Sequence, residues 1–168
     1  MNSNTNLEFT VNKENATVHV VKTFAATLPQ VWDAYTVPSL LDQWWAPRPW
    51  VSRTKSMEFK EGGRRVYAMV GPNGEEHWAL ADFTSISPKT NYKFNDAFCD
   101  ENGNITPEMP QSAWDVNFED GGESTTVSIV IKHEKLADLE QLIEMGFKEG
   151  FTAALDNLEE IFLTSKNK

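Results

Sequence analysis

The chain has 168 residues, and its 25 acidic against 15 basic side chains give a formal net charge of −10. Because this negative charge repels a phosphate backbone, we expect no nucleic-acid partner. The mean hydropathy is −0.47, and no apolar run approaches the roughly 18 residues that a membrane helix needs. We therefore expect a soluble protein without membrane insertion, and a cytoplasmic one because the first residues resemble no secretory signal.

The first part of the chain predicts one strand and two short helices. Residues 17–24 (TVHVVKTF) are rich in β-branched side chains, which favours a strand. From Pro29 onward, apolar residues recur at helical spacing in PQVWDAYT, and Pro38 opens a second short helix over residues 39–44. Residues 1–16 are expected to form an N-terminal extension, either an extra strand or a flexible segment.

Six further strands follow, separated by glycine, proline and asparagine turns. They are expected near residues 51–59, 64–70, 76–86, 91–98, 112–118 and 125–132. Alternation is clearest where Trp114, Val116 and Phe118 share one face of a strand. Turns this short join antiparallel neighbours.

The last element is predicted to be one long amphipathic helix over residues 139–162, with a disordered tail at 164–168. Its apolar side chains follow a period of 3.6 over more than twenty residues. Gly146 and Gly150 interrupt this apolar side, and each costs on the order of 1 kcal/mol relative to alanine inside a helix. Two explanations remain open: the glycines allow close approach to a strand, or they leave room for a ligand. The element order predicts an α+β fold with a single antiparallel sheet in one domain, residues 17–163.

Signatures of catalysis and metal binding are missing from the sequence. A single cysteine, Cys99, fits a reducing compartment, and His19, His77 and His133 lie far apart in segments where we expect surface or strand-edge positions. We therefore expect no metal, no cofactor and no catalytic residues. If the protein were an enzyme, Glu144 and His77 would be its candidate ionisable groups.

A resemblance to a known family rests on the run Val31-Trp32, Ala34, Thr36, Pro38, Leu41, Trp44-Trp45 and Pro47, and on later landmarks such as Glu61-Gly62-Gly63-Arg64 and Gly150-Phe151. This pattern resembles the START-like (SRPBCC) superfamily, in the branch named for the activator of the heat-shock protein 90 ATPase, and in particular its stand-alone bacterial members. The resemblance covers residues 17–162. It implies a helix-grip fold, in which a curved seven-stranded antiparallel sheet wraps a long C-terminal helix and two short helices lie between strands 1 and 2.

Such a fold can hold a cavity between the sheet and the long helix, and the aromatic residues of this chain suggest its lining. Trp44 is expected to be a core wedge, whereas Trp45 and Trp50 are expected at the rim of the cavity. The full set of predicted ligand-binding residues is Trp45, Trp50, Tyr67, Met69, Trp78, Phe94, Trp114, Phe147 and Phe151.

Three functional hypotheses follow, in order of preference. The first is a protein that binds an apolar or amphipathic small molecule, as a monomer or homodimer. The second is an enzyme of the cyclase or hydrolase type, since the same fold hosts both. The third, which rests on the family name alone, is a regulator of a chaperone ATPase of the heat-shock protein 90 type.

Overall fold

The fold is α+β, and its centre is one antiparallel sheet that curves around a C-terminal helix. The computed structural model describes residues 7–166. The strands are β1 (Leu7–Asn12), β2 (Thr17–Phe24), β3 (Val51–Met57), β4 (Arg64–Val70), β5 (Glu76–Ser87), β6 (Asn91–Phe98), β7 (Ser112–Asp120) and β8 (Thr125–His133). The helices are α1 (Leu28–Thr36), α2 (Pro38–Leu41), α3 (Leu136–Glu144) and α4 (Phe147–Lys166). None of the helices in this part of the chain is long and apolar enough to cross a membrane.

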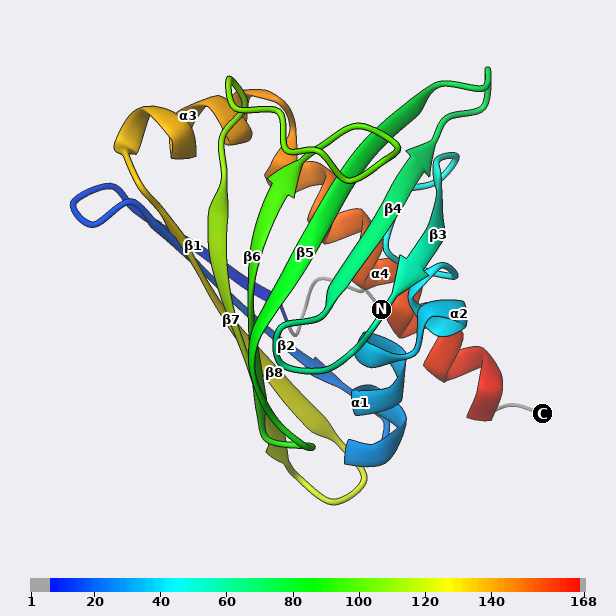
Figure 1. Cartoon of the computed structure of the whole chain (residues 1–168). Coiled ribbons are helices and arrows are strands. Elements are labelled where there is room, and N and C mark those ends of the chain that lie inside the picture. Colours follow the sequence, from blue (N-terminus) through cyan, green and yellow to red (C-terminus); the bar gives the residue numbers. More distant parts are fainter. Residues whose placement is uncertain (1–6, 167–168) are drawn as a thin grey trace.

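The sheet has eight strands in the order β1-β2-β8-β7-β6-β5-β4-β3, one more than the seven predicted. The additional strand is β1, which pairs with β2 from Leu7 opposite Lys22 to Asn12 opposite Thr17. The two short helices therefore lie between β2 and β3. Figure 1 shows α4 crossing one side of the sheet, with α1 and α2 near the opposite end from α3.

Alternation along the strands separates a concave face from a convex one. Trp114, Val116 and Phe118 of β7 point to the concave side and are buried there, as predicted. Leu155 and Leu158 of α4 are each 1% exposed and belong to the same core. A smaller cluster, which we call the convex cluster, consists of Val66, Leu80, Ala97 and Cys99, with Trp78 packed against it.

The predicted long helix is two helices. α3 ends at Glu144, and Gly146 adopts a φ of +92° before α4 begins. This left-handed conformation suits glycine, which has no Cβ. The apolar period continues across the break, so the spacing of side chains gave no sign of it. At the other end, α4 continues to Lys166, so residues 164–166 are helical where a tail was expected, and residues 167–168 of that prediction lie outside the described part.

The second short helix is also shorter than predicted. α2 covers only Pro38–Leu41, and the segment up to Trp45 continues as turns. α1 matches its prediction and begins with a capping box, in which the backbone N–H of Thr27 donates to the side chain of Gln30 at 2.9 Å.

Candidate functional site

A cavity of about 410 Å³ lies between the concave face of the sheet and the region where α3 meets α4. This volume is in the range of small-molecule sites. Met145 borders the cavity and is 53% exposed, so the space extends to the surface there. The lining is mostly apolar and aromatic, and consists of Trp45, Pro47, Trp50, Tyr67, Met69, His77, Ala79, Asp96, Phe98, Ser112, Trp114, Ile131, His133, Leu142, Met145, Gly146, Phe147, Gly150 and Phe151.

Of the predicted ligand-binding residues, all except Trp78 and Phe94 line this cavity. Phe94 lies one layer away: it is 5% exposed and stacks on Trp114, with ring centroids 5.2 Å apart. Trp78 lies on the convex face, because its neighbours His77 and Ala79 point into the cavity and successive side chains of a strand alternate. The guanidinium of Arg53 lies over the Trp78 ring.

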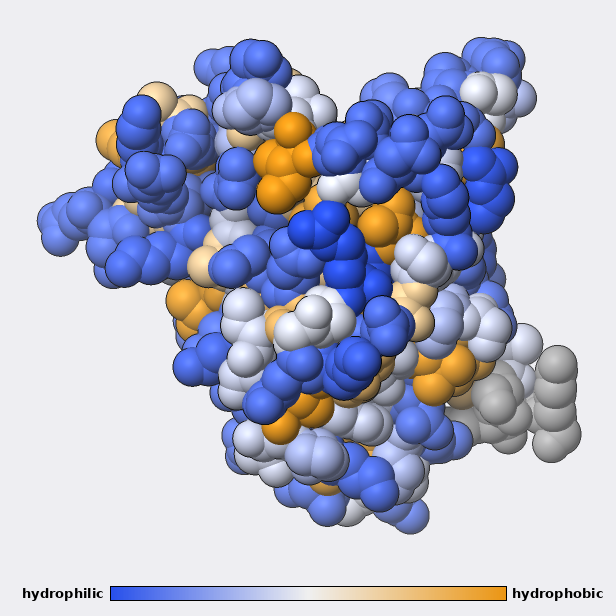
Figure 2. All heavy atoms as spheres, in the orientation of Figure 1, coloured by the Kyte–Doolittle hydropathy of each residue, from blue (hydrophilic) through white to orange (hydrophobic). Residues whose placement is uncertain are grey.

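Four rings form one wall of the cavity, which we call the aromatic wall: Trp45, Trp114, Phe147 and Phe151. Trp45 and Trp114 both contact Phe151, with centroid distances of 5.8 and 5.4 Å. Phe147 stacks on Phe151 at 5.6 Å, one turn away on α4. By contrast, hydrophilic residues cover most of the outer face drawn in Figure 2, where hydrophobic residues form small separate patches.

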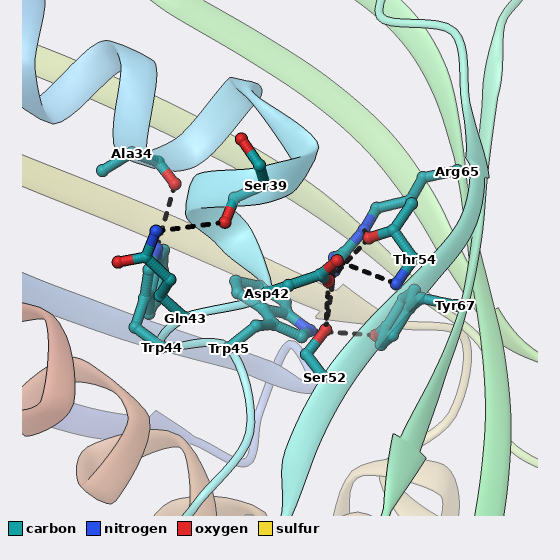
Figure 3. A network of polar contacts seen from close by, with 10 residues as sticks. All are labelled: Ala34, Ser39, Asp42, Gln43, Trp44, Trp45, Ser52, Thr54, Arg65 and Tyr67. Atoms are coloured by element: carbon teal, nitrogen blue, oxygen red, sulfur yellow. Dashed lines mark hydrogen bonds and ion pairs between the residues drawn. The ribbon is translucent and has the colours of Figure 1, made fainter.

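The adjacent tryptophans have different positions, as predicted, although both lie beyond the end of α2. Trp44 is 1% exposed, and its indole N–H donates to the carbonyl of Ala34 at 2.9 Å. Trp45 is half-buried and borders the cavity, and its N–H donates to the hydroxyl of Tyr67 at 3.0 Å (Figure 3). Trp45 therefore connects the α2 segment to β4 at the cavity wall.

A buried arginine packs against Trp45 and Tyr67, which both line the cavity. Arg65 is 3% exposed, and its guanidinium lies 3.9 Å from the centre of the Tyr67 ring. It donates to Ser52 at 3.0 Å and forms an ion pair with Asp42 at 3.4 Å. The Asp42 carboxylate also accepts bonds from Ser52 and from the backbone and hydroxyl of Thr54 (Figure 3). Burial lowers the pKa of Arg65, and nearby Tyr67 and Asp42 oppose that shift.

Three polar residues lie at opposed positions of adjacent strands at one end of the cavity. We call them the polar row: Asp96, Ser112 and His133. Asp96 of β6 lies opposite Ser112 of β7, which lies opposite His133 of β8. Directly opposed residues have Cβ atoms about 5 Å apart. All three line the cavity, so three polar side chains lie together in a space whose lining is mostly apolar.

The partners of the polar row fix which atoms are free to meet a ligand. The Ser112 hydroxyl accepts a bond from the indole N–H of Trp114 at 3.0 Å and keeps its own hydrogen available. Nδ1 of His133 lies 3.1 Å from the carbonyl of Ala16, so the neutral ring donates there and Nε2 is an acceptor. Burial lowers the pKa of His133, which favours this neutral form.

Asp96 is the most perturbed carboxyl group of the site. Burial raises its pKa to about 7, and the positive charge of Arg65 opposes the shift. Within residues 7–166, its carboxyl forms no hydrogen bond or ion pair. Tyr67 also lines the cavity. Its pKa is raised well above the ordinary value, first by burial and then by the charge of Asp96. Asp96 is thus a carboxyl group close to half-protonation at neutral pH, facing a hollow.

The polar row was not predicted, although the sequence carries a signal for it. Alternation places Tyr92, Phe94 and Asp96 on one face of β6, and one further step along β8 from Ile131 reaches His133. The predicted lining contained only aromatic residues and Met69, so these polar positions at the strand ends were not part of it. His133 was expected at the surface or a strand edge, but it is 2% exposed.

The two ionisable candidates of the sequence analysis differ in position. His77 lines the cavity and packs on Trp50, with ring centroids 5.1 Å apart. Glu144 is exposed at the end of α3 and is not part of the lining. Of the two, only His77 can meet a molecule in the cavity.

Comparison with known proteins gives one family and many similar structures. The family model described as "Activator of Hsp90 ATPase homolog 1-like protein" matches residues 25–162. A protein of Arthrobacter aurescens, solved by NMR, is 28% identical with a TM-score of 0.87, covering 92% of this chain and 90% of that one. Protein Ms6760 of Mycobacterium smegmatis is 25% identical with a TM-score of 0.84, covering 92% and 94%. No match was found among curated proteins.

Proposed function

Because the chain belongs to the family of activator of Hsp90 ATPase homolog 1-like proteins, we propose that it is a START-like protein that binds an apolar or amphipathic small molecule. The observation that carries this proposal is the 410 Å³ cavity behind the aromatic wall. Protein interiors are normally close-packed. A hollow of this size lined by Trp45, Trp114 and Phe151 therefore leaves apolar surface that a ligand can cover, and such burial favours binding.

Native mass spectrometry of the purified protein, followed by a thermal-shift screen of lipids and metabolites, tests the proposal. We expect a co-purified mass or at least one compound that raises the melting temperature, since a ligand that binds only the folded state stabilises it. Ala79→Phe places a ring in the cavity from β5 and should abolish the shift. Thr84→Phe, at an exposed position of the same strand, is the matched control and should retain it. No stabilising compound and no bound mass would contradict the proposal.

A second candidate is an enzyme of the cyclase or hydrolase type, and the polar row favours it. General acid-base catalysis works best with a group whose pKa lies near the working pH. Asp96 has a pKa of about 7 and faces the cavity, and His133 offers a neutral Nε2 at the other end of the row, beyond Ser112. Incubating the protein with compounds from the screen and analysing them by mass spectrometry tests turnover. Asp96→Asn should then stop product formation while binding persists, and product formed equally by the variant would contradict an acid-base role.

A further inference from the structure

The cavity has unequal ends, and the hydrogen-bonding capacity of its polar end is incompletely used. The hydroxyl of Tyr67 accepts from Trp45, and that of Ser112 accepts from Trp114, so each keeps one hydrogen to donate. Asp96 accepts no bond within the described part of the chain. Asp96 is partly buried and lines a poorly solvated hollow, where a polar group gains from a hydrogen-bond partner, so a ligand that supplies one is favoured.

From this arrangement we propose that the ligand of the cavity carries a head group that donates a hydrogen bond, a hydroxyl or an ammonium group, and that this head contacts Asp96 while the apolar part lies against the aromatic wall. The inference rests on the proposed binding function and specifies the chemical class of its ligand. It excludes fatty acids and other carboxylates as the preferred class.

The charges around the polar row explain the discrimination against carboxylates. An anionic head group beside Asp96 would be repelled by the ionised carboxylate, and this repulsion is strong in a poorly solvated space. The positive charge of Arg65 acts on Asp96, but its guanidinium is bonded to Ser52 and Asp42 and does not border the large cavity, so it gives an anionic head no direct partner. Among the described residues that line this cavity, none carries a permanent positive charge. Of its two histidines, His133 has a lowered pKa, which favours the neutral ring, and His77 packs on Trp50.

The aromatic wall specifies the apolar part of a suitable probe. Phe147 and Phe151 are stacked with an interplanar angle of 12°, and Trp114 meets Phe151 edge-on at 83°. Further rings gain from such offset and edge-to-face contacts. Naphthalene derivatives are therefore matched probes, since they share one apolar body and differ only in the head group.

Calorimetric titration with 2-naphthol, 2-methoxynaphthalene and 2-naphthoate tests the inference at about pH 8, where Asp96 is mostly ionised. A hydrogen bond to a charged acceptor should make 2-naphthol bind about tenfold or more tightly than either analogue. Asp96→Asn should weaken 2-naphthol and strengthen 2-naphthoate, because it removes both the anionic acceptor and the repulsion. Glu119→Gln removes one negative charge at an exposed position of β7 and should leave all three affinities unchanged.

The possible outcomes separate this inference from the proposed function. If 2-naphthoate binds the unmodified protein as tightly as 2-naphthol, the head-group inference is overturned and the binding function stands. If none of the probes binds, both are overturned. The comparison of probes on the unmodified protein does not depend on the folding of any variant. If Asp96→Asn keeps the original tenfold preference, another group recognises the head, and the assignment to Asp96 is overturned.

Discussion

Alanine at Gly146 and alanine at Gly150 should change stability in opposite directions, although the two glycines are four residues apart. Gly146 has a φ of +92°, and an added Cβ there meets nothing within 4 Å. The penalty for alanine is thus one of backbone conformation, about 1–2 kcal/mol. Gly150 lies within α4, and its added Cβ meets Pro47 Cγ at 3.7 Å, an ordinary contact. Alanine there should stabilise the protein by about 0.5–1 kcal/mol.

Urea unfolding followed by tryptophan fluorescence measures both effects. The two variants should differ by about 2 kcal/mol in unfolding free energy, with unchanged dependence on urea. For a chain of this size that difference corresponds to about 4–8 °C in melting temperature. If Gly146→Ala is as stable as the unmodified protein, the helix break does not require a left-handed glycine. If Gly150→Ala is destabilised, the helix needs close approach at Gly150, and our account of the space beside it is wrong.

Three other predictions concern the walls of the site. Asp42→Asn should lower the free energy of unfolding by about 2–4 kcal/mol, because it leaves the buried guanidinium of Arg65 without its counter-charge. The control Glu160→Gln breaks an exposed ion pair and should lower it by less than about 1 kcal/mol. Similar urea midpoints for the two variants would refute the distinction. Trp44→Ala should cost about 3–5 kcal/mol and Trp45→Ala clearly less, because only Trp45 already borders a cavity, and equal losses in the same assay would show that both rings are core. The Asp96 carboxyl should titrate in the folded state near its raised pKa of about 7 when followed by carbon NMR. Because this pKa exceeds that of the unfolded chain, the folded state binds the proton more tightly. The stability relative to Asp96→Asn should therefore fall as the pH rises from about 4 to about 7. Titration of the folded carboxyl near pH 4 would contradict this prediction.

The strands could be predicted because their signal is short-range. Each strand from β2 to β8 was found within two residues of its observed start and end, since β-branched and aromatic residues alternate between glycine and proline turns. The concave position of Trp114 and Val116 followed from the same alternation. The same alternation along β5 indicates which face Trp78 occupies. Its predicted place in the lining depended instead on the number of aromatic residues in the chain, and so it was wrong.

The helix break could not be predicted, because the side chains on either side of it keep the same spacing. Ile143, Phe147 and Phe151 are four residues apart, as in a continuous helix, yet the chain leaves α3 after Glu144. A glycine in a helical pattern is compatible with both helical and left-handed backbone, and only the tertiary packing selects one. The pairing of β1 also depends on contacts with β2 that local sequence does not encode.

The break and the polar row lie at the same end of the molecule, and this explains why the cavity forms there. β8 ends at His133 and α3 begins at Leu136, so the chain starts its last helices beside the polar row. The left-handed Gly146 then changes the direction of the chain, and both α3, through Leu142, and α4, through Phe147 and Phe151, contribute to the lining. Further along α4, Leu155 and Leu158 are each 1% exposed in the core, so helix and sheet are in contact there. The left-handed Gly146 thus lies where the filled part of the concave face gives way to the cavity, next to the carboxyl group that we infer recognises the ligand's head.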